Sequence, residues 1–225
     1  GFELYRTGGE AEADADERCA LVADMIAAGK FTEAYAVWSD GHRVNVDRDS
    51  TTERASQAGI FNGDFESPSG RDETGFDWRF ARAQGSPQSP VNFSLDSTRP
   101  HGGARSLLLD FDGSPDINAR LVSQLLPVEP GARYRLSFAA RTESLVSGGM
   151  PQVVLMNAAG DRALAQSEAL PRDAGEWRVY TVEFIAPEGG MLVAVKRLPC
   201  PQPTCPIFGR AWFDDFSLEQ LSNRK

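Results

Sequence analysis

The sequence predicts a mainly β protein, an antiparallel β-sandwich or jelly roll with a short α-helical hairpin at its N-terminal end. After residue 60, short β-favouring runs alternate with clusters of Gly, Pro, Asn and Asp. Connections such as Pro130-Gly131 leave no room for crossover helices, which favours antiparallel pairing. Along residues 133–141, large apolar and polar side chains alternate strictly, as expected for a strand with one buried face. The predicted strands cover residues 105–111, 120–126, 133–141, 152–157, 177–185, 191–197 and 211–218.

The N-terminal residues show a helical pattern instead. Four apolar residues recur at the spacing of one helix face: Leu21, Val22, Met25 and Ile26. Gly29 can end this helix, and residues 31–38 begin another. Residues 28–34 resemble the join between the two helices of a tetratricopeptide repeat, where a Gly, an aromatic and an Ala hold these relative positions. One such repeat cannot bury its apolar face alone, so the second helix should pack on the β domain, on upstream repeats or on a partner protein.

Composition sets the domain boundaries. Residues 41–58 are polar and charged, which indicates a linker. We therefore expect a helical hairpin at 1–40, a linker at 41–58, the jelly-roll domain at 59–222 and a short tail at 223–225.

Length and charge exclude several classes of function. A chain of 225 residues with 41% hydrophobic content can bury one core and carry a smaller appendage. The net charge of -9 disfavours binding to nucleic acid or to an anionic membrane surface. No apolar run approaches the roughly 20 residues that span a bilayer. The start at Gly indicates a trimmed chain, so the lack of a signal peptide here does not argue against export.

Two of the three cysteines, Cys200 and Cys205, lie close together among four prolines. A disulfide between them would close a short loop and imply an oxidising compartment. Half of a zinc site is disfavoured, because the two histidines, His42 and His101, have no metal-ligand spacing. Two free thiols in a cytosolic protein are the remaining alternative.

Two acidic-aromatic motifs bracket the β region: Asn62-Gly63-Asp64-Phe65-Glu66 opens it and Trp212-Phe213-Asp214-Asp215-Phe216-Ser217-Leu218 closes it. Each places carboxylates beside aromatics in a segment that the pattern predicts to be a strand. We therefore expect the two ends to lie side by side in one sheet and to pool their acids. Pooled acids with no neighbouring base are typical of a site for a hard cation.

Three further motifs lie between these two: His101-Gly102-Gly103-Ala104-Arg105-Ser106-Leu107, residues 128–138 and residues 175–184. In this order the five motifs resemble the carbohydrate-binding modules of families 4 and 9, over about residues 60–221. The resemblance implies a jelly roll that binds a glycan or polysaccharide without catalysis and belongs to an exported protein. One alternative is a protein-interaction or scaffold module of an envelope or polysaccharide-handling system that no longer binds sugar and docks a partner through the helices.

The resemblance also implies a structural calcium ion, with side-chain oxygens from Glu66 and Asp214. Asp64 would add a carbonyl oxygen, and Asp215 is the alternative side chain if the register differs by one. Two carboxylates with several carbonyls are a usual calcium ligand set. In the competing interpretation, these acids cap turns or pair with Arg79 or Arg210.

Candidate ligand-binding residues are of two kinds. Sugar-binding sandwiches usually place Trp or Tyr rings against sugar faces, and the candidate rings are Trp78 and Trp212. The polar sides of the predicted strands offer Asp110, Gln124, Arg135, Arg141 and Lys196, which would suit a polar or acidic glycan if they converge on one sheet surface. The alternatives are buried tryptophans and a solvated sheet face.

The sequence does not predict an enzyme. It has no Gly-x-Ser-x-Gly elbow, no phosphate-binding Gly-Lys-Ser or Gly-Lys-Thr loop, and no His beside a nucleophile motif. Glu66 and Asp214 could form a glycosidase-type carboxylate pair, but metal binding explains the same acids better.

Overall fold

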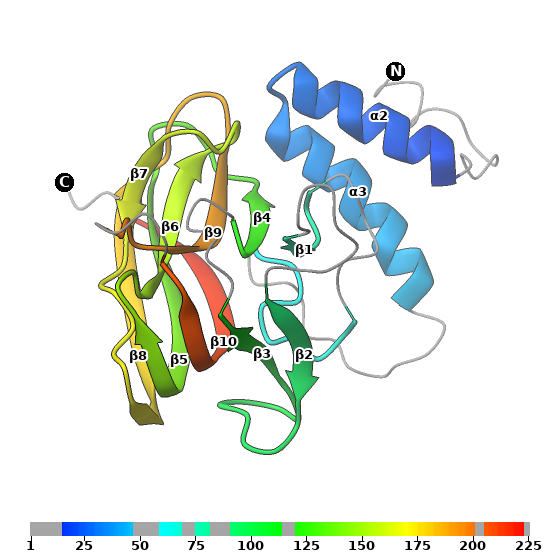
Figure 1. The fold of residues 1–225 in the computed structure, drawn as a ribbon. Coiled ribbons are helices and arrows are strands. Elements are labelled where there is room, and N and C mark those ends of the chain that lie inside the picture. Colours follow the sequence, from blue (N-terminus) through cyan, green and yellow to red (C-terminus); the bar gives the residue numbers. More distant parts are fainter. Residues whose placement is uncertain are drawn as a thin grey trace.

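A computed structural model describes residues 15–46, 59–68, 75–81, 91–113, 120–200 and 205–222. Two antiparallel sheets face each other in these residues and form a sandwich (Figure 1). The first sheet has the order β1 (Arg79–Phe80), β4 (Val122–Leu126), β9 (Met191–Arg197), β6 (Pro151–Asn157) and β7 (Ala163–Gln166). The second has the order β2 (Asn92–Asp96), β3 (Ser106–Asp112), β10 (Ile207–Leu221), β5 (Arg133–Ser147) and β8 (Ala174–Ile185). The predicted fold class is confirmed.

All seven predicted strands are present, and β9 has the predicted bounds. Strands β5 and β10 run further than predicted, and the added start of β10 contains a register shift between Phe208 and Arg210. Three short strands were missed: β1, β2 and β7. Each lies at or beside a sheet edge or has mostly half-exposed residues, so hydrophobic alternation marks it weakly.

The core lies between the inner faces of the two sheets. Phe138 on β5 stacks on Tyr180 of β8, with ring centres 5.1 Å apart, and on Phe216 of β10 at the same distance. The inward positions of the first sheet include Val193 and Leu155, both fully buried. On β5, the alternation in residues 133–141 also identified the core face, where Tyr134, Leu136 and Phe138 are buried.

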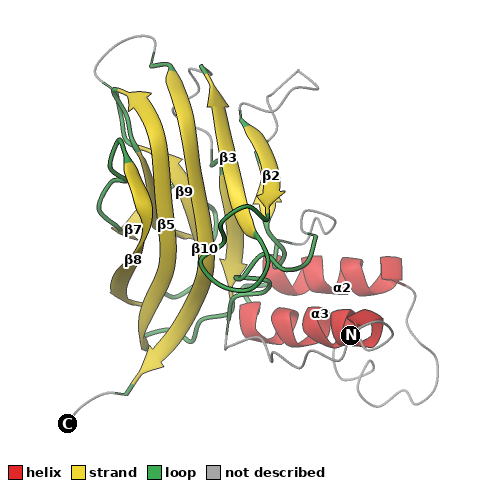
Figure 2. Cartoon of the chain, turned by 90° about the horizontal axis from the view of Figure 1, so that it is seen from below, coloured by secondary structure: helices red, strands yellow, loops and turns green. Residues whose placement is uncertain are grey.

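Two helices, α2 (Ala15–Ala27) and α3 (Phe31–Val46), pack side by side against one flank of the sandwich (Figure 2). The Trp38 ring of α3 lies 4.9 Å from the Phe61 ring, and Tyr35 lies 5.3 Å from Phe76. The apolar side of α3 is therefore covered by the β domain, the first of the three expected partners. The likeness to a tetratricopeptide repeat stays a prediction.

Helix α3 continues to Val46, six residues beyond the predicted end of the hairpin at 40. It passes through Gly41, whose cost in a helix interior is only about 1 kcal/mol relative to Ala. The rest of the predicted linker, residues 47–58, lies outside the described residues. Within the described parts of the chain, no helix is long and apolar enough to cross a membrane.

The predicted disulfide between Cys200 and Cys205 is present, with Cα atoms 6.0 Å apart. The neighbouring Arg197 is buried and donates hydrogen bonds to the Cys205 carbonyl at 2.6 Å and the Ser147 hydroxyl at 2.7 Å. This arginine ties the cysteine loop to the end of β5.

Candidate functional site

The two acidic-aromatic motifs meet, but the first one is a turn and not the predicted strand. Asn62 and Phe65 have positive φ angles of 48° and 52°, which a strand does not allow. The Phe216 N–H donates to the Gly63 carbonyl at 2.9 Å, and a Cβ at Gly63 would overlap the Phe216 carbonyl. The close approach of the two motifs therefore depends on glycine at position 63.

Glu66 and Asp214 both face the loop that joins β2 to β3. Glu66 Oε1 accepts hydrogen bonds from the N–H groups of Ala104 and Arg105, at 2.7 and 3.0 Å. Asp214 Oδ2 accepts from the N–H groups of His101 and Gly102, at 2.9 and 3.2 Å. The motif at residues 101–107 thus wraps the two predicted calcium ligands.

Asp214 is fully buried, and burial raises its pKa to about 6. The nearby Asp215 charge acts in the same direction, whereas the hydrogen bonds from Gly102 and His101 oppose it. The Asp215 carboxylate lies to the side, where its Oδ2 accepts a hydrogen bond from His101 Nδ1 at 2.6 Å. Among the described residues, the structure brings together the side chains of Glu66, Asp214 and Asp215, and the expected Asp64 carbonyl ligand stays a prediction.

The donor set partly fits a calcium ion. Glu66 and Asp214 direct hard carboxylate oxygens toward the same loop. Gly103 allows the backbone of that loop to lie directly against the Glu66 carboxylate. The loop N–H groups already occupy much of the acceptor capacity of Glu66 Oε1 and Asp214 Oδ2. Among the described residues, no group of three or more His, Cys, Asp or Glu side chains is arranged to hold a metal.

Trp78 is structural, so its predicted ligand role is wrong, whereas Gln124 has a structural role and also lines the cavity described below. Trp78 is completely buried, packs on Phe65 and Phe216, and donates its Nε1–H to the Asn62 carbonyl at 3.0 Å. Gln124 is 1% exposed and holds both polar backbone groups of Phe61, at 2.9 and 3.1 Å. Both side chains fix the segment that leads from the hairpin into the sandwich.

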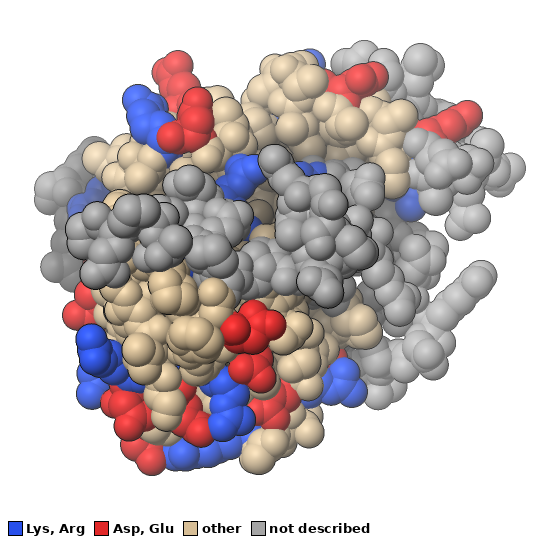
Figure 3. Space-filling view, viewed as in Figure 1, with Lys and Arg blue, Asp and Glu red and all other residues tan. Residues whose placement is uncertain are grey.

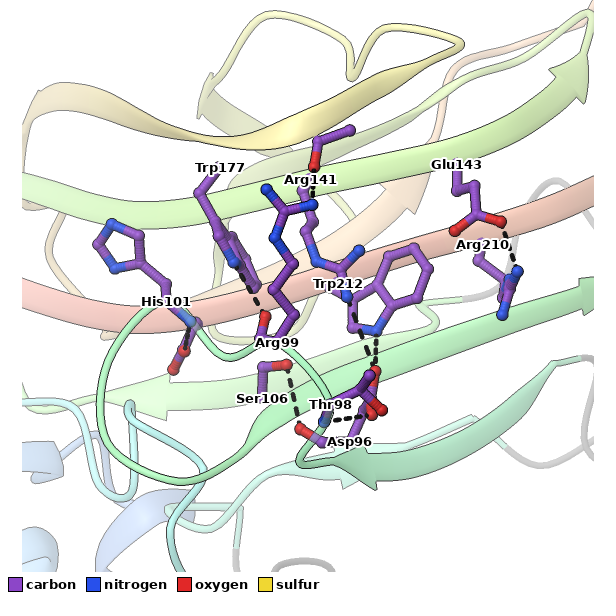
Figure 4. Close-up of polar contacts among 12 residues, drawn as sticks. Asp96, Thr98, Arg99, His101, Ser106, Arg141, Glu143, Trp177, Arg210 and Trp212 are labelled. Carbon is purple, nitrogen blue, oxygen red and sulfur yellow. Dashed lines mark hydrogen bonds and ion pairs between the residues drawn. The ribbon is translucent and has the colours of Figure 1, made fainter.

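Trp212 lies on the outer face of the second sheet, covered by Arg141 (Figure 4). The Arg141 guanidinium carbon is 3.6 Å from the centre of the Trp212 ring and 5.4 Å from that of Trp177. The Trp212 Nε1–H donates to Asp96 Oδ2 at 2.6 Å, and Arg141 pairs with the same oxygen at 3.7 Å. With only 2% of Trp212 exposed, its ring offers no face to a sugar.

Asp96 connects this cluster to the turn after β2. Burial acts to raise the Asp96 pKa, but hydrogen bonds from Thr98 and Trp212 and the Arg141 charge outweigh it, so the pKa is lowered. Burial lowers the pKa of the Arg141 guanidinium, which Asp96 opposes. Among described atoms, Arg141 Nε is buried without a hydrogen-bond partner. The cluster is a packed structural unit.

The remaining predicted polar residues do not converge. Arg135 pairs with Glu183 at 2.8 Å and with Glu219 at 3.4 Å on the second sheet. Asp110, also on the second sheet, lies opposite Arg210. Gln124 and Lys196 belong to the first sheet. The predicted single polar surface is therefore wrong, because the strands that carry these residues are divided between the two sheets.

A cavity of about 600 Å³ lies between the helical hairpin and the outer face of the first sheet. Figure 3 shows this side of the molecule hollowed, with Lys or Arg atoms beside the hollow. The hairpin contributes an apolar wall, including Ile26 and Phe31. The sheet contributes Ser123 and Leu125 of β4 and Leu192 of β9. No sequence pattern indicates this cavity, because its walls come from segments far apart in the chain.

Two arginines, Arg79 and Arg120, line the cavity, and no acidic side chain does so among the described residues. Each guanidinium lies against a glycine. A Cβ at Gly75 would come within 3.3 Å of Arg79 Cζ, and one at Gly160 would overlap the Arg120 guanidinium. Both glycines have positive φ angles, 109° and 74°.

The fold is similar to that of a solved carbohydrate-binding module of family 4, with a TM-score of 0.52 and 14% identity over 72% of this chain and 99% of that chain. It is also similar to part of an arabinose-bound α-L-arabinofuranosidase, with a TM-score of 0.51 and 15% identity over 76% of this chain and 27% of that chain. A xylan-binding domain of family 22 from Paenibacillus barcinonensis has a TM-score of 0.48 and 15% identity over 76% of this chain and 100% of that domain. No protein-family model and no curated protein matches the chain.

At identities this low, the likeness establishes the fold alone. The class defined by the fold is therefore the jelly-roll sandwich to which carbohydrate-binding modules also belong.

Proposed function

We propose that this protein binds a glycan or polysaccharide without reacting with it, in the cavity between the hairpin and the first sheet. The cavity carries this proposal. Its volume of about 600 Å³ falls within the range of about 300–1,000 Å³ typical of ligand sites. Its lining combines apolar side chains such as Phe31 and Leu192 with the polar groups of Ser123 and Arg79, a mixture that suits the apolar faces and hydroxyls of a sugar. The similar fold of a carbohydrate-binding module adds support.

Binding without catalysis fits the positions of the acids. Hydrolysis by a carboxylate pair needs two acids that face each other across the sugar. Glu66 and Asp214 instead accept N–H bonds from one loop, and the described lining of the cavity contains no acid.

A calcium ion at the β2–β3 loop is part of the proposal. Glu66 and Asp214 would hold it through their side chains, with Asp215 and the Asp64 carbonyl as the additional candidates. The ion would neutralise the carboxylates of Glu66 and Asp214, which accept hydrogen bonds from backbone N–H groups of the loop. It would stiffen this loop and would not take part in the proposed sugar site.

We also propose that the protein is exported. The disulfide between Cys200 and Cys205 supports this, because such bonds persist mainly in oxidising compartments.

The alternative function, a protein-interaction module, has one observation in its favour. Val179 and Ile185, on the edge strand β8, are both 64% exposed. Exposed apolar residues on a sheet edge can pair with another chain. This surface differs from the predicted docking site on the helices, whose apolar side is covered by the sandwich.

A glycan array tests the proposal with three proteins: wild type, Ala159→Trp and Ala36→Trp. Ala159 is exposed and lines the cavity, so a Trp side chain there fills the site without disturbing the core. Ala36 is equally exposed on α3 and does not line the cavity. The proposal expects wild type and Ala36→Trp to bind the same glycans and Ala159→Trp to lose them. Equal binding by all three proteins would place the site elsewhere, and no binding by folded wild type would refute glycan recognition.

A further inference from the structure

The guanidinium groups of Arg79 and Arg120 have no partner among the described residues. Neither side chain makes a hydrogen bond or ion pair with another described residue, whereas the Arg79 backbone pairs with Ser123 of β4. Three arginines of the second sheet are instead engaged by acids: Arg135 with Glu183, Arg210 with Glu143, and Arg141 with Asp96. Two unpaired guanidinium groups therefore line the same cavity.

The positive charge of the cavity lining contrasts with the negative charge of the whole chain. The chain has 32 acidic and 23 basic residues and a net charge of -9, yet the described lining of the cavity has two arginines and no acid. An acidic protein with a cationic pocket attracts anions to that pocket and disfavours them elsewhere.

Each guanidinium contacts a glycine, although both arginines are exposed. Arg120 lies against Gly160 in the turn after β6, and the Gly160 position has no room for a Cβ. Arg79 lies against Gly75, whose carbonyl accepts a hydrogen bond from Leu125 at 2.7 Å.

We propose that the ligand of this cavity is an acidic saccharide, whose carboxylate or sulfate is bound by Arg79 and Arg120; this rests on the glycan-binding function proposed above. A guanidinium matches either anion through two parallel N–H bonds, so both groups share the recognising chemistry. The apolar wall from α2 and α3 would contact the sugar ring, while the arginines bind its charged substituent.

The experiment compares matched polymers on the intact chain. Polygalacturonate is paired with the same polymer after reduction of its carboxylates to alcohols, and dextran sulfate is paired with dextran. The first pair tests the carboxylate and the second the sulfate. The acidic member of at least one pair should bind at least about tenfold more tightly than its neutral partner, because a hydrogen bond to a charged group contributes at least that much.

Variants assign the effect to the two arginines. The double variant Arg79→Gln/Arg120→Gln should lose the preference for the acidic polymer, and Lys at both positions should retain part of it. Arg178→Gln is the matched control, because Arg178 is exposed on β8 of the other sheet and removal of its charge should change nothing.

The outcomes separate this inference from the proposed function. Equal binding of neutral and acidic polymers, abolished by Ala159→Trp, would overturn the inference and leave glycan binding in the cavity intact. An acidic preference that survives in the double Gln variant would also overturn it. If no polymer in either pair binds, or if Ala159→Trp does not affect binding, both proposals fail for these ligands.

Discussion

The guanidinium carbon of Arg141 lies 3.6 Å from the centre of the Trp212 ring, and each side chain shields the other from water. The pair joins neighbouring strands β5 and β10 on the outer face of the second sheet. This contact explains how a large aromatic can point outward from the sandwich and still be buried.

Arg141→Ala should therefore destabilise the protein. The change exposes Trp212 and removes the ion pair to Asp96, so we expect the free energy of unfolding to fall by about 1–3 kcal/mol. Urea denaturation measures this loss. Arg178→Ala is the control and should change stability by less than about 0.5 kcal/mol. A loss no larger than the control's would show that the cluster contributes little.

Asp96 should make part of this stability depend on pH. Its folded-state pKa is lowered, so the native protein prefers the carboxylate. The stabilisation is complete above the unfolded pKa of about 4 and is lost as pH falls through the lower, folded value. The stability difference between wild type and Asp96→Asn should thus be largest near pH 7 and shrink below about pH 4. A difference that stays constant from pH 7 to pH 3 would contradict the lowered pKa.

Trp78→Phe should weaken folding and leave ligand binding unchanged. The substitution keeps an aromatic ring in the core but removes the hydrogen bond to the Asn62 carbonyl, at a cost of about 1–2 kcal/mol. Trp78→Ala should cost about 3–5 kcal/mol, because it also leaves a cavity. Denaturation and glycan binding are measured on the same samples. A folded Trp78→Phe protein that no longer binds would restore Trp78 as a ligand residue.

Calcium should raise the melting temperature of wild type, and chelator should reverse the rise. Binding to the folded state stabilises it in proportion to the logarithm of free calcium above the dissociation constant. Glu66→Gln should lose the calcium-dependent part, since the amide removes one carboxylate. Glu176→Gln, at an 85% exposed side chain, is the control and should keep the response. Identical melting curves with calcium and with chelator would exclude a structural calcium.

Reduction of the disulfide between Cys200 and Cys205 should lower stability by about 2 kcal/mol, the chain-entropy value for so short a loop. Denaturation with and without reductant measures the loss. A Cys200→Ser/Cys205→Ser variant should match the reduced protein and no longer respond to reductant. An equal response in this variant would assign the effect to another residue.

The sequence predicted the sandwich because its strands follow the two-residue period closely. In β9, Met191, Val193 and Val195 alternate toward the core, and its predicted bounds matched the structure. The same period contained unused information about Gln124, which shares a strand face with Val122 and Leu126 and is therefore directed inward.

The candidate site was not predictable in the same way. The cavity depends on where Phe31 meets the turn at Gly190, and on Arg79 and Arg120 reaching one space from separate segments. Such placements depend on tertiary packing between distant parts of the chain, which a local periodicity does not encode. The burial of Trp212 under Arg141 likewise depends on the pairing of β10 with β5.

The most direct test of the central proposal is an NMR titration of the labelled protein with the glycan found on the array. We expect amide shifts to cluster around Ser123, Ala158, Leu192 and the C-terminal end of α2, which surround the cavity. Saturation of these shifts at one ligand per protein would support a single site there. Shifts centred instead on Trp177 and Arg135, on the outer face of the second sheet, would contradict the proposed site.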